Sequence, residues 1–253
     1  MSNRTCTCSL HCVFELSDAQ LDELVSLLQL SDSAFPTGRY IHSYGLETYA
    51  QDGLLNSPNR ASMLLDLLSD SIRLGVAPSD GTALACSHRA IGLEPQVGLE
   101  LIVKADSRLT AVKLASEARD ASKRMGRALL HEAVTTFAGR AISSYAELVE
   151  AGRSPGNHAV VFGVLTATLG VPTVAAITSE LYAFSASWVA AAVRLSLTDH
   201  HTAQILLHRV RSVIADAALN AASRDVRHIS SCTPLLDVMA MRHEQADLRL
   251  FAS

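Results

Sequence analysis

The ten histidines of this chain are the residues best suited to metal binding or catalysis. His200, His201 and His208 fall within one expected helix, and the first and last lie two turns apart on one face. Imidazole nitrogens bind borderline metals such as nickel and zinc, so these residues are candidate ligands of a helical metal-binding protein or metal-dependent enzyme. The outer pair spans about 12 Å, so one ion would need a further ligand from elsewhere. A pair of solvated or interface histidines is the alternative interpretation.

A second candidate metal site lies near the amino terminus, where three thiols and an imidazole fall within seven residues. Cys6, Cys8 and Cys12, together with His11, have the chemistry to bind a soft metal ion, but their spacing matches no known zinc finger. We interpret residues 1–16 as a flexible cysteine-containing tail. We therefore expect the protein to hold no resident metal or cofactor. These cysteines and the three histidines are the candidate ligands if a metal is bound.

Signatures of the common catalytic classes are missing from the sequence. There is no phosphate-binding GxxxxGK[ST] or GxGxxG loop and no GxSxG elbow. His131-Glu132 lacks the second histidine of a helical zinc protease site. The net charge of −4 leaves no basic excess to neutralise phosphates. We predict a protein that is not an enzyme and does not bind nucleic acid.

The five cysteines and the amino-terminal composition bear on the compartment. An odd number of cysteines in a chain too large to need disulfides favours a reducing environment. Arg4, His11 and Glu15 interrupt any apolar run near the amino terminus, so we predict no signal peptide. We expect a cytoplasmic protein.

Composition and hydrophobic pattern predict an all-α fold. Apolar residues make up 49% of the chain and aromatic residues 5%, Ala and Leu are abundant, and β-branched runs are short. We predict one helical-bundle-like domain of about nine or ten helices over residues 17–230. Residues 231–253 are expected to form a carboxy-terminal helix and tail, in which Leu250 and Phe251 dock onto the core or onto a partner because exposure in water is unfavourable.

Helix boundaries follow from capping residues and from apolar residues at helical spacing. A capping box opens the first helix at Ser17, and its apolar residues should form one buried face: Leu21, Leu24, Val25 and Leu28. Further helices are expected from Ser43 to Gln51, through Met63 to Gly75, from Ser79 or Asp80, over 108–137, from a capping box at Ser144 to Gly152, over 159–169 and 172–195, from Thr198 or Asp199 through Ala217, and from Pro234. Gly126, inside one of them, predicts a close approach of another helix.

One long uncharged run raises the alternative of a membrane-spanning helix. The 21 residues from Ala159 to Ser179 carry no charge and reach the length of a membrane span. Gly170 and Pro172 divide the run, so two shorter helices joined by a turn fit better. We expect both to be buried inside the domain.

One segment gathers turn formers, apolar residues and polar groups where a helix should begin: Ser33-Ala34-Phe35-Pro36-Thr37-Gly38-Arg39-Tyr40-Ile41-His42-Ser43-Tyr44-Gly45-Leu46-Glu47. Pro36 and Gly38 end the preceding helix, and Ser43 can cap the next one. His42 lies at this junction, where backbone geometry restricts it on both sides. The pattern suits a fixed contact surface or, equally, a buried structural turn.

This segment resembles the signature of the UreF family of urease accessory proteins. Three further blocks of likeness follow in order: 122–130, 156–163 with His158, Phe162 and Gly163 at a helix junction, and 236–251 with Leu236–Glu244 and Arg249-Leu250-Phe251. Together the four blocks cover roughly residues 21–253. Two departures are Arg39-Tyr40, and Ala246-Asp247 where we expect a Tyr-Ser pair.

The resemblance implies an all-α, homodimeric urease maturation factor with chaperone function. Members of the family join UreD, also called UreH, and the GTPase UreG, and this assembly loads nickel into apo-urease. GTP belongs to UreG, and nickel passes through the complex as cargo. Carried over by position, the partner-binding residues are Phe35, Pro36, Gly38, His42, Ser43, Gly45 and Glu47 in the signature, and Arg242, His243, Glu244, Arg249 and Phe251 in the carboxy-terminal segment.

Overall fold

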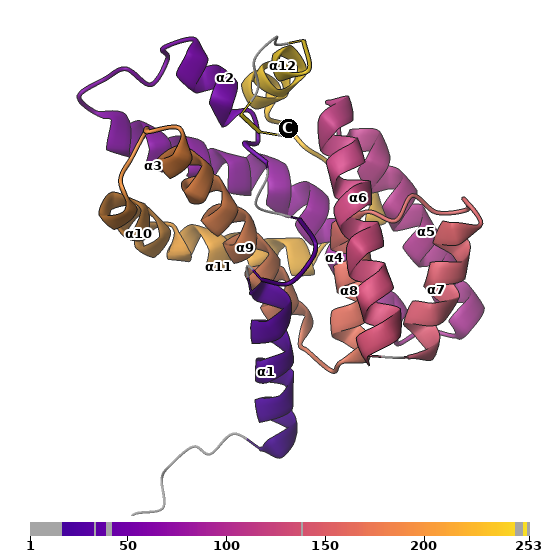
Figure 1. The fold of residues 1–253 in the computed structure, drawn as a ribbon. Helices are drawn as coiled ribbons and strands as arrows, with labels where there is room; N and C mark the ends of the chain where they lie inside the picture. The colour runs from indigo at the N-terminus through magenta and orange to yellow at the C-terminus, as the bar shows by residue number, and fades with distance from the viewer. Residues whose placement is uncertain (1–16, 33, 39–41, 138, 246–249, 252–253) are drawn as a thin grey trace, which may run out of the picture.

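The protein is described by a computed structural model, which covers residues 17–32, 34–38, 42–137, 139–245 and 250–251. Within these residues the fold is all-α and has no strand, as predicted (Figure 1). Twelve α-helices make up this part of the chain: α1 Asp18–Ser31, α2 Leu46–Gln51, α3 Arg60–Asp70, α4 Thr82–Ala90, α5 Pro95–Val112, α6 Ser116–Glu132, α7 Arg140–Glu150, α8 His158–Thr168, α9 Thr173–Arg194, α10 His200–Arg209, α11 Arg211–Ala222 and α12 Pro234–His243. Two π-helical segments, Ser71–Gly81 and Ala133–Phe137, and a 3-10 turn, Val226–His228, connect some of them.

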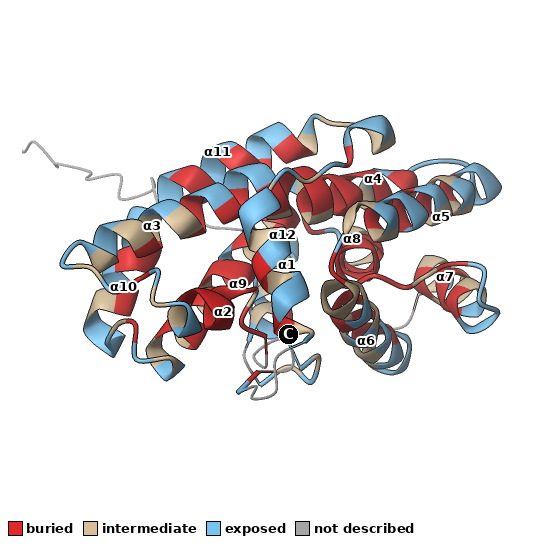
Figure 2. Cartoon of the chain, turned by 90° about the horizontal axis from the view of Figure 1, so that it is seen from above, coloured by how far each residue is buried: buried red, intermediate tan, exposed pale blue. Residues whose placement is uncertain are grey.

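Helix α8 forms the centre of the core because it carries no charged residue around its circumference. Every residue from His158 to Thr166 is buried, and Figure 2 shows the helix enclosed by its neighbours α4 and α6. Gly163 permits the close packing of α4, since a Cβ there would lie 2.6 Å from the carbonyl oxygen of Leu84. The close approach predicted at Gly126 is also present. Its neighbour is the loop before α8, and a Cβ would meet the carbonyl oxygen of Gly156 at 1.9 Å.

The uncharged run 159–179 folds as two helices, as predicted. Helix α8 ends at Thr168, Gly170 adopts a φ of +78°, and α9 begins at Thr173 after Pro172. Among the described residues, no helix is both long enough and apolar enough to cross a membrane.

The long helix expected over 108–137 is divided, and so is the helix expected from Thr198 or Asp199 through Ala217, where α10 ends at Arg209 and α11 begins at Arg211. The described residues therefore contain more α-helices than expected. Helix α5 ends at Val112 because Lys113 turns to an extended conformation and pairs with Asp80 at 2.7 Å. Arg119, from the first turns of α6, donates to the carbonyl oxygens of Lys113 and Leu114 at 2.7 and 2.6 Å. These contacts stabilise the break by satisfying carbonyls that the ended helix leaves free.

Several other predicted boundaries were wrong for local reasons. Glu94 caps α5 through the amides of Gln96 and Val97, so this helix begins well before residue 108. Ser144 caps nothing, because α7 has already begun at Arg140. Ser79 lies inside a π-helical segment, where its hydroxyl donates to the carbonyl of Gly75.

Helix α1 has its predicted capping box, but the face expected to be buried is exposed. Ser17 and Gln20 cap each other reciprocally. Leu30 is buried against the body and Leu27 is half-buried, whereas the four residues predicted as the buried face are exposed: Leu21, Leu24, Val25 and Leu28. Figure 1 shows α1 extending away from the helical body. The packing face therefore contains Leu27 and Leu30, and the predicted one faces solvent.

Candidate functional site

Two segments separated by almost 200 residues meet at one edge of the fold. Helix α2, which follows the signature segment, packs on α12 near the carboxy terminus. Gly45 begins α2 with a φ of +81°, and a Cβ at this position would lie 3.3 Å from the carbonyl oxygen of Leu236. The hydroxyl of Thr48 donates to the carbonyl oxygen of Met239 at 3.0 Å. A small residue with a left-handed backbone at position 45 therefore allows the two helices to touch.

His243 links the carboxy-terminal helix to two other helices through paired carboxylates. Its Nε2 lies 3.0 Å from Oε2 of Glu47 on α2, and its Nδ1 lies 2.9 Å from Oε2 of Glu117 on α6. The His243 and Glu47 side chains are fully buried, and that of Glu117 is largely so. A hydrogen bond from an imidazole N–H to an ionised carboxylate is charge-assisted, so these contacts tie α12 to α2 and α6.

Glu47 also holds the end of the chain. Its Oε1 accepts a hydrogen bond from the amide of Leu250 at 2.8 Å, and its Oε2 accepts one from the amide of Phe251 at 3.3 Å. The Phe251 ring is buried, and the guanidinium carbon of Arg194 lies 4.3 Å from its centroid. Glu47 thus fixes the tail by its backbone, and Arg194 covers the aromatic side chain.

Glu244 and Arg242 make further contacts from the end of α12. The carboxylate of Glu244 accepts a hydrogen bond from the amide of Glu117 at 3.2 Å, at the amino-terminal end of α6. Partial burial acts to raise the pKa of Glu244, but hydrogen bonds from Glu117 and Ser116 lower it overall. Arg242 pairs through both terminal nitrogens with Asp52, and this pair is partly exposed. These contacts join the end of α12 to α2 and to the amino-terminal end of α6.

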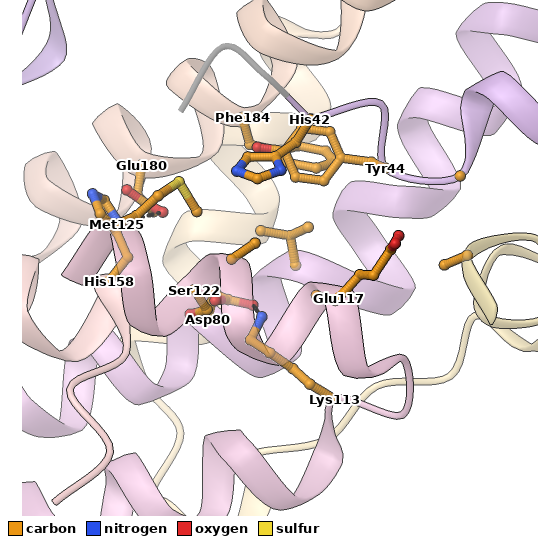
Figure 3. A pocket seen from close by; sticks show the side chains of 15 residues that line it. His42, Tyr44, Asp80, Lys113, Glu117, Ser122, Met125, His158, Glu180 and Phe184 are labelled. Carbon is orange, nitrogen blue, oxygen red and sulfur yellow. Dashed lines mark hydrogen bonds and ion pairs between the residues drawn. The ribbon is translucent and has the colours of Figure 1, made fainter. Parts of the chain in front are cut away.

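A cavity of about 130 Å³ lies beside this junction (Figure 3). Its walls combine the signature segment with α6, α8, α9 and the segment before α4: among them are His42, Tyr44, Asp80, Lys113, Glu117, Ser122, His158, Glu180 and Phe184. His158 and Glu180 form a buried pair at 3.4 Å, and Tyr44 meets Phe184 edge-on at 4.8 Å between centroids. The hydroxyl of Ser122 in the cavity wall, in contrast, is buried and has no hydrogen-bond partner among the described residues.

The three candidate histidine ligands lie on the surface of the fold. His200, His201 and His208 are all exposed on α10. Cys6, Cys8 and Cys12 lie outside the described residues. Within the part of the chain that the structure covers, no three His, Cys, Asp or Glu side chains are arranged to hold a metal ion.

Many of the predicted partner-binding residues do come together, but in the interior. His42, Ser43, Gly45, Glu47, His243 and Phe251 are buried around the α2–α12 contact. Phe35 is half-buried, Pro36 and Gly38 are exposed, Arg242 is exposed, and Glu244 is half-buried. Arg249, like Arg39-Tyr40 and Ala246-Asp247, lies outside the described residues. Of this buried set, Glu47 holds the tail directly and His243 contacts Glu47.

Glu117 and Arg194 complete the junction, and no local pattern in the sequence indicated either residue. Each lies on a helix far along the chain from the residue it meets. Glu117 is 126 residues from His243, and Arg194 is the last residue of α9, far along the chain from Phe251. Only the packing of α6 and α9 against the tail brings them into place.

Comparison with known proteins assigns the chain to a family. The family model described as UreF matches residues 59–211. "Urease accessory protein UreF" of Paenarthrobacter aurescens (strain TC1) is 32% identical over 229 residues, which cover 90% of this chain and 97% of that protein. The chain belongs to the UreF family.

Other UreF relatives match over nearly their full length. "Urease accessory protein UreF" of Trichodesmium erythraeum (strain IMS101) is 30% identical over 236 residues, covering 93% of this chain and 99% of that protein. "Urease accessory protein UreF 2" of Brucella canis (strain ATCC 23365 / NCTC 10854 / RM-666) is 29% identical over 252 residues, covering 99% of each. All three relatives are named as accessory proteins, not as enzymes. The resemblance seen in the sequence is thus confirmed.

A buried carboxylate organises the UreF-like block at residues 156–163. Asp106, fully buried on α5, accepts hydrogen bonds from Tyr145, Ser154, the amide of Gly156, and both the amide and side chain of Asn157 at 2.6–3.0 Å. Burial, followed by the charge of Asp106, raises the pKa of Tyr145 well above its usual value. This network fixes the loop that enters α8, and the sequence alone did not indicate it.

Proposed function

We propose that this protein is a cytoplasmic urease maturation factor that scaffolds UreD (UreH) and the GTPase UreG during nickel insertion into apo-urease. It has no catalytic activity of its own. GTP is bound by UreG, and nickel is cargo of the complex. Two copies of the chain form a homodimer within the assembly. Family membership supports the role in maturation, and the arrangement around α12 supports the mode of action.

The observation that carries the proposal is the docking of the tail by Glu47. A buried carboxylate that receives His243 and two tail amides holds the chain end in one position. Such a buried polar contact is costly unless every partner is present, so it specifies one arrangement of the tail. A fixed chain end at the surface suits recognition by another protein.

The surface above this contact is apolar with a cationic edge. Leu235, Val238 and Met241 follow one another along α12 and are 55%, 49% and 38% exposed, and Leu250 on the tail is 80% exposed. Arg242 lies beside them and is also exposed. Large exposed side chains gathered on one element mark a protein-binding surface. We propose this surface, here called the α12 face, as the docking site for a maturation partner.

Co-purification with UreD and UreG from a common host tests the proposal. The wild-type chain should recover a ternary complex. Replacing Leu235 and Val238 with Ser should abolish it while leaving helical content by circular dichroism unchanged, because both side chains are already largely in water. Leu219→Ser, at a residue 60% exposed on α11, is the matched control and should bind normally.

Two variants separate the contribution of Arg242 to partner binding from its ion pair with Asp52. Because the pair is partly exposed, solvent screens it and it contributes little to stability. Arg242→Ala should therefore weaken partner binding strongly, whereas Asp52→Ala breaks the same pair and should leave binding nearly intact. Equal effects of the two variants would show that Arg242 acts only within the fold. Persistent failure of well-folded wild-type protein to bind either partner would refute the scaffolding role.

Use of the exposed histidines as a metal-dependent active site is the rival function, and no contact among the described residues favours it. Substituting His200, His201 and His208 with Ala should leave partner binding unchanged. A tightly bound, stoichiometric metal in the isolated wild-type protein that is lost in this variant would support the rival.

A further inference from the structure

Helix α1 carries a second exposed apolar surface, distant from the α12 face. Leu21, Leu24, Val25 and Leu28 are 46%, 43%, 61% and 62% exposed. Their spacing of three and four residues aligns them in one stripe along the helix. We call these four residues the α1 stripe.

Contacts with the other described residues do not explain the α1 stripe. Helix α1 meets α9 through other residues: Leu30 is buried, Leu27 is half-buried, and the hydroxyls of Ser31 and Ser179 lie 2.5 Å apart. These contacts gather near the carboxy-terminal end of the helix, and Figure 1 shows the remainder projecting from the body. Helix α1 therefore has one apolar face that packs against α9 and a different apolar face that is exposed.

Charge on this segment has a single sign. From Leu16 to Gly38 the sequence contains no Lys, Arg or His, and its ionisable side chains are Asp18, Asp22, Glu23 and Asp32. Asp18 and Asp22 precede Leu21 and Val25 by three residues each, so both border the stripe. The outward surface of α1 is thus apolar with an acidic edge.

The apolar stripe and its acidic edge together favour some binding partners of α1 over others. Two copies of α1 paired through their stripes would bring acidic edges together, and like charges at close range disfavour that contact. An anionic membrane surface would repel the same edge, since interfacial helices carry Lys and Arg on the polar side. A groove with an apolar floor and a rim of Lys or Arg satisfies both features.

We propose that α1 is a docking helix for a second protein of the maturation complex, whose surface provides an apolar groove with a basic rim. This inference rests on the proposed function for the choice of partner. It adds a surface separate from the α12 face. The geometry corresponds to an amphipathic helix laid into a groove, with residues 21, 24, 25 and 28 as anchors.

Binding of purified UreD (UreH) and UreG to the full-length chain, each measured by calorimetry, tests the inference. The double variant Leu24→Ser, Leu28→Ser should weaken binding to one of these partners by about 100-fold, since each anchor contributes about tenfold. The charge variant Asp18→Lys, Asp22→Lys should weaken the same interaction at low salt and remove most of its dependence on salt. Leu219→Ser is again the control and should behave as wild type.

The outcomes separate this inference from the proposed function. Wild-type binding that neither α1 variant alters would overturn the docking role of α1 and leave the scaffolding role in place. Failure of the wild type to bind either partner would overturn both. If the α1 variants instead lose self-association in sedimentation velocity while partner binding persists, a second copy occupies the stripe and the inference is wrong.

Discussion

Replacement of Glu47 by Ala should release the carboxy-terminal tail. The side chain of Glu47 accepts hydrogen bonds from the amides of Leu250 and Phe251 and pairs with His243. Ala removes the acceptor for all three donors. The two amides can recover hydrogen bonds only by leaving the site for water, because buried donors without partners are costly.

The magnitude follows from the number of bonds. A hydrogen bond to a charged group contributes about 1.5 to 3 kcal/mol, so two amides lose about 3 to 6 kcal/mol of docking free energy. The lower bound corresponds to a change of about 100-fold in the docking equilibrium. Native-state hydrogen exchange at Leu250 and Phe251 should accelerate by at least about this factor, while circular dichroism should show nearly unchanged helical content.

Thr48→Val is the matched control on the same helix. Thr48 contacts α12 through the carbonyl of Met239 and does not touch the tail amides. Its loss should cost about 1 kcal/mol and change exchange at Leu250 and Phe251 by less than about tenfold. Unchanged exchange at these two amides in Glu47→Ala would refute the role of Glu47 as the anchor of the tail.

Three further predictions concern the core and the α12 contact. Gly126→Ala places a Cβ 1.9 Å from the carbonyl oxygen of Gly156 and should cost about 3 kcal/mol or more in urea unfolding; wild-type stability would contradict this close approach. Asp106→Asn removes the charge from a buried acceptor of five hydrogen bonds and should cost about 3 kcal/mol or more in thermal unfolding; a loss below about 1 kcal/mol would refute its organising role. The pKa of Glu244 is lowered in the fold, so its stabilising contribution is present above its usual value of 4.5 and is lost as pH falls through the folded value. The stability difference between wild type and Glu244→Gln, measured by urea unfolding, should therefore shrink below about pH 4.5, and a constant difference would count against these hydrogen bonds.

Local sequence signals predicted the helices that depend on local chemistry. Gly170 and Pro172 divide the uncharged run where expected, and Pro234 opens α12 at its first turn. Ser17 forms its predicted capping box. These features depend on backbone geometry and on neighbours within a few residues, which a sequence displays directly.

Features that depend on tertiary contacts were not predictable in this way. The break after Val112 is stabilised by the ion pair of Lys113 with Asp80, which is 33 residues away in the sequence and which the fold brings to Lys113. The α1 helix contains two apolar faces, and spacing alone does not say which one packs. Similarly, the signature residue Glu47 belongs to the block that resembles the family, but its partners on α12 and at residues 250–251 became visible only in the structure.

Reconstitution of urease activation tests the scaffolding role most directly. Apo-urease, UreD (UreH), UreG, GTP and nickel are combined with or without the purified chain, and urease activity is measured. We predict that activity appears with the wild-type chain and stays near background without it or with the Leu235→Ser, Val238→Ser variant. Equal activation in the absence of the chain would contradict its proposed role in maturation.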